Sequence, residues 1–400
     1  MARHSAPRES LGVNAYSEQW LRRGFPWVYR DEIVRAPRAL QPGAVVGLTG
    51  PSGAALGVGI WDDAHVAVRR FREDDGAIDA DLLGARLVAA LARRVLPPQT
   101  TAWRWVHGEN DDLPGVRVDV WGGSLGVALD SPALLPLLQP LLGEVASRWP
   151  DPARPLEQAW LSWRLEEGRS DKGLPRGLVQ TWAAADDEVW VQERGLWYAV
   201  RPQDGFDAGL YCDMREARTW MAPGWTVKKV LNTFCFTGAY SVAAAAGGAA
   251  EVVSVDLSGP SLARARANLL RNGLPEGRLW EEDVFRALDR LRRTGERFDV
   301  VVADPPSFSR GADGSWSASQ DLGKLVASCL RVLRPGGWLI AASNNGKVSP
   351  KAFQEQLQEG ARRAERRLRI LHQCSQPPDF PAALHFPESR YLKCWIVEAT

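Results

Sequence analysis

Polar residues follow four apolar runs in the C-terminal half of this 400-residue chain, and their types suit contacts to a nucleoside. The small-residue stretch 232–238 would let the backbone approach a ligand closely. Asp256 ends the run EVVSVD, where an acid can accept hydrogen bonds from ribose hydroxyls, and Asp283 could accept one from an adenine amine. The stretch 304–308, DPPSF, closes the run FDVVVA, and its two prolines stiffen a turn.

Each motif also has a plain structural explanation. The stretch 232–238 is not the G-x-G-x-x-G dinucleotide fingerprint and could be an ordinary turn between a strand and a helix. Asp256 could cap the following helix, for which Ser258 is an equal candidate, and Asp283 could be a solvated loop acid. A purely structural strand would rarely end in DPPSF, which also argues against a nicotinamide-dependent enzyme.

The surrounding pattern predicts the elements that would position these motifs. From about residue 226, apolar runs that suit buried strands alternate with stretches of helical spacing. This alternation is typical of a parallel, doubly wound sheet, in which ligands bind at the carboxyl ends of the strands. A further run, WLIAAS, leads to Ser343-Asn344-Asn345-Gly346.

The N-terminal half follows a different pattern. Segment 18–72 predicts a small β-rich module, with a hairpin turn at 50–53 between two of its strands. Segment 78–96 has helical spacing, 103–129 resembles a β-meander, and 132–147 again predicts a helix. Segment 151–192 is rich in Pro, Gly, Asp and Glu, which is typical of loops with short strands.

Length and composition predict two to three globular domains, because the chain is 45% hydrophobic and 24% charged. No run approaches 18 apolar residues and the N-terminus has no apolar signal core, so we expect no membrane span and a cytoplasmic protein with reduced thiols. The net charge of +1 argues neither for nor against nucleic acid. No Cys/His cluster suggests a metal site.

Together, the four motifs resemble those of class I S-adenosylmethionine (SAM)-dependent methyltransferases. The resemblance implies SAM as the cofactor, with Asp256 on its ribose and Asp283 on its adenine. Asp304 would lie beside both the cofactor and the substrate. The methionine part of SAM would lie against the turn, through Asn232, Phe234, Phe236, Thr237 and Gly238.

The resemblance to bacterial large-subunit rRNA methyltransferases is closer and covers about residues 18–400. DAGLYCDMREAR at 207–218 resembles their cofactor lid, which would bring Tyr211, Asp213 and Arg215 to the cofactor. ESRYLKCW near the C-terminus resembles a further segment of these enzymes. LRRGFPWVYRDEI at 21–33 resembles the RNA-binding PUA domain of the type I branch, and 107–121 resembles its central linking domain.

These matches imply an α/β fold class with three domains. We expect an N-terminal β-rich PUA-like domain over 1–73, a small α+β linking domain over 74–192, and a Rossmann-like methyltransferase domain over 193–400. The expected partner is large-subunit rRNA. The sequence does not decide whether free rRNA or an assembly intermediate is the substrate, or whether the chain forms a homodimer.

One departure from the type I branch concerns the reaction. Those enzymes make 5-methylcytosine, which needs a thiolate to attack carbon 6 of the base. Their cysteine lies in an S-C-S-G segment, and Asn344 occupies that position here. None of the cysteines of this chain lies in 304–308 or 343–346: they are Cys212, Cys235, Cys329, Cys374 and Cys394.

DPPSFSRG and ASNNGK instead resemble motifs of the guanine-N7 half of the fused K/L rRNA enzyme. Guanine N7 carries an in-plane lone pair, so its methylation needs correct positioning of the base and no nucleophile from the enzyme. Asp304, Pro305 and Pro306 would frame the base, and Asp304 could stabilise its positive charge. Phe308 could stack on the base while Asn344 and Asn345 bind its edge, unless these are a core aromatic and a polar loop.

We therefore predict a SAM-dependent methyltransferase that modifies guanine N7 in large-subunit rRNA. One alternative is a cytosine-C5 enzyme that uses another cysteine. A second is an RNA-binding ribosome-assembly factor that keeps the cofactor pocket without catalysis. A third is a small-molecule methyltransferase, for which a PUA-like module would have no evident purpose.

Overall fold

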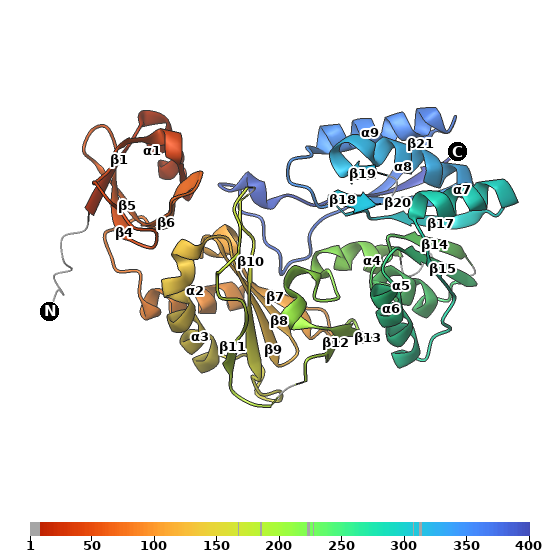
Figure 1. The fold of residues 1–400 in the computed structure, drawn as a ribbon, viewed down its shortest axis with the longest axis horizontal. Helices are drawn as coiled ribbons and strands as arrows, with labels where there is room; N and C mark the ends of the chain where they lie inside the picture. The colour runs from red at the N-terminus through yellow and green to blue at the C-terminus, as the bar shows by residue number, and fades with distance from the viewer. Residues whose placement is uncertain are drawn as a thin grey trace. The chain divides into compact units, whose positions relative to one another are not determined.

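The computed structural model describes residues 9–166, 168–184, 186–221, 225–226, 228–306, 308–311 and 314–400 (Figure 1). Its contacts divide the chain into two compact units. The first contains the residues up to Val189 together with 201–208 and 378–389. The second contains 190–200, 209–377 and 390–400, so the chain passes between the units repeatedly.

The first unit begins with a six-stranded sheet of order β2-β6-β5-β4-β1-β3. Its elements are β1 (Glu9–Val13), α1 (Ala15–Arg22), β2 (Trp27–Tyr29), a 3₁₀ turn (Arg30–Glu32), β3 (Ile33–Arg35), β4 (Val45–Thr49), β5 (Ala55–Trp61) and β6 (Val66–Arg72). The predicted hairpin is confirmed, because β4 and β5 pair antiparallel across residues 50–53. Leu11, Val28 and Leu48 are fully or almost fully buried in the core of this sheet.

A five-stranded sheet of order β11-β10-β9-β8-β7 follows in the same unit. Its elements are α2 (Ala80–Ala92), β7 (Ala102–His107), a 3₁₀ turn (Gly108–Asp111), β8 (Val116–Trp121), β9 (Ser124–Leu129), α3 (Leu138–Ser147), β10 (Gln158–Trp163) and β11 (Gly177–Thr181). The predicted meander is confirmed by the antiparallel pairing of β7, β8 and β9. The helical stretch predicted over 132–147 is confirmed, as a 3₁₀ helix over Pro132–Leu137 that continues into α3. Pro136 has no N–H for an α-helical bond there.

Residues 378–389, far along the chain, complete the first unit. The Asp379 carboxylate accepts a hydrogen bond from the Arg104 N–H at 3.0 Å, and the Asn110 side-chain oxygen accepts one from the Ala383 N–H at 2.8 Å. The Phe386 ring lies 4.8 Å from the Trp27 ring, centroid to centroid. A segment near the C-terminus therefore packs on both sheets of the first unit.

The second unit contains a seven-stranded sheet of order β16-β15-β14-β17-β20-β22-β21. Its strands are β14 (Lys229–Thr233), β15 (Glu251–Asp256), β16 (Arg278–Glu281), β17 (Phe298–Ala303), β20 (Leu333–Ser343), β21 (Leu368–Cys374) and β22 (Lys393–Ala399). The predicted parallel arrangement is confirmed for β16, β15, β14, β17 and β20, whereas β22 runs antiparallel to β20 and β21. The strand order reverses at β14, which pairs with β15 on one side and β17 on the other.

Helices pack on both faces of this sheet. Its helices are α4 (Arg215–Met221), α5 (Ala239–Ala246), α6 (Gly259–Arg271), α7 (Val284–Thr294), α8 (Ala318–Val332) and α9 (Pro350–Arg363). Leu231 and Val301 point into a core with α7, α8 and α9, whereas Val230 and Val300 point into a core with α4 and α5. This alternation makes both faces of the strands apolar, as in a doubly wound fold.

The remaining elements are short. They are the pair β12 (Val189–Glu193) and β13 (Leu196–Val200), the pair β18 (Phe308–Gly311) and β19 (Gly314–Ser317), and 3₁₀ turns at Pro202–Asp207, Cys212–Met214 and Pro387–Ser389. Within the described residues, no helix combines the length and the apolar character that a membrane crossing requires.

Candidate functional site

The carboxyl ends of four parallel strands bring most of the motifs to one edge of the sheet. Thr233 is in register with Val255 on β15 and with Ala303 on β17, and Ala303 is in register with Ala341 on β20. The turn after β14, Asp256, Asp304 and the loop after β20 therefore leave the sheet side by side. This edge also carries the strand-order reversal, where ligands bind in open α/β sheets.

The turn after β14 has an unusual backbone. Phe234, Phe236 and Gly238 all have positive φ, at 52°, 49° and 76°. A left-handed conformation is unfavourable for phenylalanine, so the surroundings must hold it. The Asp256 carboxylate does so, since its Oδ2 accepts from the Phe236 N–H at 2.8 Å while its Oδ1 accepts from the Ser258 N–H at 2.9 Å.

Asn232 and Thr237 support this turn from within the protein. Asn232 is 2% exposed, and its amide donates to the Ser241 hydroxyl at 2.9 Å. The Ser241 and Ser254 hydroxyls are hydrogen-bonded at 2.7 Å, which joins β14, α5 and β15. The buried Thr237 hydroxyl donates to the Gly209 carbonyl. The side chains of both residues are thus engaged in hydrogen bonds within the protein.

The two acids with alternative structural roles differ. Ser258 caps α6 through its bond from the Ser261 N–H at 3.2 Å, so the cap considered for Asp256 is wrong. The solvated loop acid considered for Asp283 is also wrong, because Asp283 caps α7: its Oδ1 accepts from the N–H groups of Phe285 at 2.9 Å and Arg286 at 3.0 Å.

Residues 209–218, which contain the lid residues, divide into an exposed and a buried part. Tyr211 is 38% exposed, with its ring 5.5 Å from that of Phe236. The Asp213 carboxylate accepts from the Tyr391 hydroxyl at 2.8 Å. Arg215 instead points into the protein, fully buried and 3.4 Å from the Glu193 carboxylate.

Arg218, the last residue of the lid motif, and Glu193 hold this segment in place, although the sequence predicted no role for either. The Arg218 guanidinium donates two 2.7 Å bonds to the buried Glu193 carboxylate and one of 3.0 Å to the Tyr211 carbonyl. A bidentate pair of this kind fixes direction as well as distance. An arginine three residues after Arg215 on the same helix was the only available signal.

Asp304, at the end of β17, has a strongly altered acidity. The pKa of its carboxyl is raised from 3.8 to about 7, mainly by burial and to a smaller extent by the nearby Asp213 charge, while Arg218 opposes the shift. Pro305 is buried and Pro306 is exposed. Ser307 and the side chain of Phe308 lie outside the described residues. The edge therefore carries a carboxyl group that changes charge near neutral pH.

The loop after β20 contains two asparagines with different surroundings. The Asn345 side-chain oxygen accepts from the Lys347 N–H at 2.9 Å, and its carbonyl accepts from the Val348 N–H at 3.0 Å. Asn345 thus closes the turn with its own side chain. Asn344 is exposed next to it.

Asn268 on α6 and Asn272, which follows its last residue as the C-cap, were not predicted from the sequence. Asn268 is fully buried, accepts from the Ala199 N–H at 2.7 Å and donates to the Thr237 carbonyl at 2.8 Å. Asn272 accepts from the Trp197 N–H and donates to the Trp197 carbonyl, both at 2.8 Å. They tie β13 and the turn after β14 to α6. Asparagine is unfavourable inside helices, so Asn268 in the middle of a predicted helix was a usable signal.

No cysteine of the described chain is exposed. Burial raises the pKa of Cys329 to about 12 and that of Cys235 well above its usual range, with Asp256 adding to the second. A hydrogen bond with Cys374 and burial likewise raise the pKa of Cys394. These three thiols are protonated at neutral pH and are poor nucleophiles. The described residues also contain no cluster of His, Cys, Asp and Glu suited to a metal ion.

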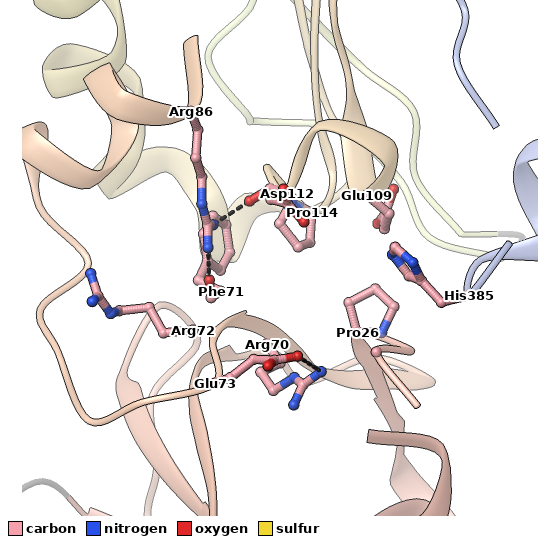
Figure 2. A pocket seen from close by; sticks show the side chains of 11 residues that line it. Pro26, Arg70, Phe71, Arg72, Glu73, Arg86, Glu109, Asp112, Pro114 and His385 are labelled. Carbon is pink, nitrogen blue, oxygen red and sulfur yellow. Dashed lines mark hydrogen bonds and ion pairs between the residues drawn. The ribbon is translucent and has the colours of Figure 1, made fainter. Parts of the chain in front are cut away.

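The first unit contains a separate cavity of about 130 Å³ (Figure 2). It lies between β6, the loop that joins α1 to β2, α2 and the segment that contains His385. The guanidinium of Arg86 donates to the carbonyls of Phe71 and Asp112, as the dashed lines in Figure 2 show. Arg70 donates to the Leu56 carbonyl at 3.3 Å and to the Glu73 carboxylate at 3.2 Å.

Arg86 therefore stabilises the first unit, and we expect Arg86→Met to lower its free energy of unfolding by about 2 kcal/mol, because the part-buried Phe71 carbonyl and the exposed Asp112 carbonyl both lose their donor. Arg72→Met is the matched control in the same cavity. Its ion pair with the 63% exposed Asp74 predicts a loss below about 1 kcal/mol. Denaturant unfolding of both variants measures the difference, and equal losses would contradict the assignment.

Comparisons with known proteins agree with this arrangement. A family model described as S-adenosylmethionine-dependent methyltransferase matches residues 177–388, and one described as PUA-like domain matches residues 12–72. The "Ribosomal RNA large subunit methyltransferase" of Deinococcus radiodurans is 34% identical over 407 residues, covering 98% of both chains. The "Ribosomal RNA large subunit methyltransferase I" of Erwinia tasmaniensis is 30% identical over 383 residues, covering 94% of this chain and 96% of its own.

Solved structures show the same fold. A methyltransferase crystallised with S-adenosylhomocysteine (SAH) superposes with a TM-score of 0.85 at 24% identity, covering 97% of this chain and 99% of that one. A SAM-dependent methyltransferase from Streptococcus mutans gives a TM-score of 0.84 at 24% identity over the same shares. The predicted α/β fold class, with its PUA-like N-terminal part, is confirmed.

Proposed function

The chain belongs to the S-adenosylmethionine-dependent methyltransferase family, and from that premise we propose that it methylates N7 of a guanine in large-subunit rRNA. The full-length similarity to large-subunit rRNA methyltransferases and the PUA-like module support RNA as the substrate. We retain three domains, 1–73, 74–192 and 193–400, as part of this proposal.

The residues at the sheet edge fit SAM. When bound, SAM supplies an electrophilic methyl group on a positively charged sulfur. We assign the turn 234–238 to its methionine part, Asp256 to its ribose and Asp283 to its adenine. Tyr211 would cover the site beside Phe236, and Asp304, whose carboxyl has a pKa of about 7, would face the positive charge. Asn232, Thr237 and Arg215 would support these groups from behind.

The observation that carries the choice of guanine N7 is Asn344. It stands where a cytosine-C5 enzyme needs a thiolate, and an amide cannot form a covalent bond to carbon 6. An amide can instead form hydrogen bonds with the edge of the target nucleobase. The N7 lone pair can accept the methyl group directly, so the enzyme needs to supply neither a general base nor a nucleophile. We assign this contact to Asn344, whereas Asn345 holds the turn through the Lys347 N–H.

Cytosine C5 remains the second candidate, because the full-length relatives include enzymes of type I, 30% to 32% identical to this chain. Nucleoside mass spectrometry of large-subunit rRNA, with and without the gene, separates the two. Loss of one 7-methylguanosine supports the proposal, whereas loss of one 5-methylcytosine refutes it. An unchanged nucleoside content would favour an RNA-binding factor without catalysis.

Variant genes returned to a strain without the gene test the role of Asn344 in rRNA methylation. Asn344→Ala is expected to lower methylation by about 30-fold, because one good base contact contributes about 1–3 kcal/mol. The double variant Cys212→Ala with Cys235→Ala changes the lid and the cofactor turn, but it should still methylate the rRNA, because no thiol takes part in the reaction. The opposite pattern, with Asn344→Ala active and the cysteine variant inactive, would show that a thiol does the chemistry.

A further inference from the structure

A lysine is buried beneath the loop after β20. Lys393 is the first residue of β22, where it is paired with Ser343 at the end of β20, and it is 4% exposed. Its ammonium donates to the Asn345 carbonyl at 2.6 Å and to the Tyr391 carbonyl at 2.5 Å. One side chain thus joins two loop segments to the sheet.

Both carbonyls belong to segments next to the candidate site. Asn345 follows Asn344, and its carbonyl also accepts from the Val348 N–H at 3.0 Å, so the lysine binds a turn that is already closed. The Tyr391 hydroxyl donates to Asp213 at 2.8 Å, and the charge of Asp213 helps to raise the pKa of Asp304. The lysine is thereby linked to both sides of the sheet edge.

Stability alone does not explain a lysine at this position. The strand continues as Cys394, Trp395 and Ile396, all buried, so an apolar side chain would suit the site. Removing an ammonium group from water costs free energy, and burial lowers the pKa of Lys393 to about 8. Apolar replacements of buried charges are often neutral or stabilising. A charged donor that reaches two carbonyls does, however, fix the geometry of both segments.

We propose that Lys393 is a positioning residue for methyl transfer, which holds the Asn344–Asn345 turn at the distance from Asp304 that the target base requires. This inference rests on the proposed function. Asp304 follows Ala303, which is in register with Ala341 on β20, so the turn and the carboxyl leave neighbouring strands. A turn free to move relative to that carboxyl would hold the base poorly.

The test compares full-length Lys393→Met with wild type. We expect kcat to fall by about 30-fold, because misplacement of reacting groups by about 1 Å costs up to about 100-fold. The KM for rRNA and the dissociation constant of SAH should stay within about twofold. Lys393→Arg, which keeps the charge and the donors, should recover kcat to within about fivefold of wild type.

Lys229→Met is the matched control. Lys229 is also a partly buried lysine of this sheet, at the amino end of β14, where it is paired with Glu251 at 2.9 Å and Glu296 at 2.6 Å. Its loss should change the melting temperature but leave kcat within about twofold. If Lys393→Met does not fold, Lys393→Gln, which keeps a shorter N–H donor, undergoes the same measurements.

Hydrogen exchange provides a measurement independent of activity. The Val348 N–H, bonded to the Asn345 carbonyl, should exchange at least about tenfold faster in Lys393→Met, with the β14 amides unchanged. Three results for Lys393→Met would overturn the inference: an unchanged kcat, a loss of SAH affinity as large as the loss of kcat, or unchanged hydrogen exchange at the Val348 N–H. If wild type methylates no rRNA, the proposed function fails, and the exchange data alone decide whether Lys393 holds the turn.

Discussion

Asp304→Asn is expected to lower the rate of methyl transfer by about 100- to 1000-fold. The carboxylate of Asp304 is proposed to face the charge that moves from the cofactor to the base, and removing one such group from a preorganised site typically has this effect. Asparagine has nearly the same shape, so the loss would be electrostatic. Single-turnover kinetics with purified rRNA measures the rate of the chemical step without product release.

The Asp304 carboxyl also determines how the rate of methyl transfer is expected to depend on pH. Burial raises the pKa of Asp304 from 3.8 to about 7, so the carboxyl is mostly neutral at pH 6 and mostly ionised at pH 8. The rate should therefore rise with pH through about 7 and level off above it. Ionisation of this buried group is unfavourable, so its contribution to folding stability decreases as pH rises from about 4 to about 7.

Cofactor binding offers a control for this assignment. SAM carries a positive charge that SAH lacks, so the affinity for SAM should increase between pH 6 and 8 while that for SAH changes little. Asp304→Asn should abolish this difference. Calorimetric titration of both ligands measures it. An Asp304→Asn enzyme with an unchanged pH profile would show that another group titrates.

Gly238→Ala should reduce SAM affinity by at least about 100-fold. Gly238 is the N-cap of α5 with φ of 76°, and a Cβ added there would lie 2.8 Å from the Ala265 Cβ and 3.3 Å from its Cα. Ala265 is fully buried on α6 and has no flexible end that could move aside. The turn 234–238 would have to shift, because both the backbone conformation and the available space exclude a side chain.

Gly295→Ala is the matched control for Gly238→Ala. Gly295 ends α7 with almost the same φ, 75°, but an added Cβ would meet nothing within 4 Å. The backbone penalty, about 1–2 kcal/mol, is then the same in both variants. Equilibrium binding of SAM and thermal melting separate the effects. If Gly295→Ala lost as much SAM affinity, general destabilisation rather than the turn would be responsible.

The sequence predicted the strands of the second unit and the positions of their polar ends, because both are local properties. An apolar run of the right length that ends in a polar residue marks the edge of a parallel sheet, as Asp256 and Asp304 do. The direction in which each polar side chain points was harder to predict. Asn232 lies within β14 rather than after it, and its side chain is directed under α5. The strand extends two residues beyond its apolar run, so Asn232 and Thr233 are buried in the sheet rather than exposed in the turn.

The supporting residues could not be predicted because their partners are distant in the sequence. Arg218 pairs with Glu193, 25 residues away, and Lys393 bonds Asn345, 48 residues away. No local pattern reports such a pair. The 3₁₀ helix before α3 was predictable in part, since Pro136 prevents one α-helical hydrogen bond, but helical spacing alone does not register a missing donor.

The segment 378–389 has a consequence for biosynthesis. Asp379, Ala383 and Phe386 pack on elements near the N-terminus, so the first unit lacks part of its core until almost the whole chain has been translated. The N-terminal sheets would leave the ribosome first and would remain incompletely packed until this segment is translated. The order of folding is then not the order of synthesis, and no single cut in the chain yields two complete units.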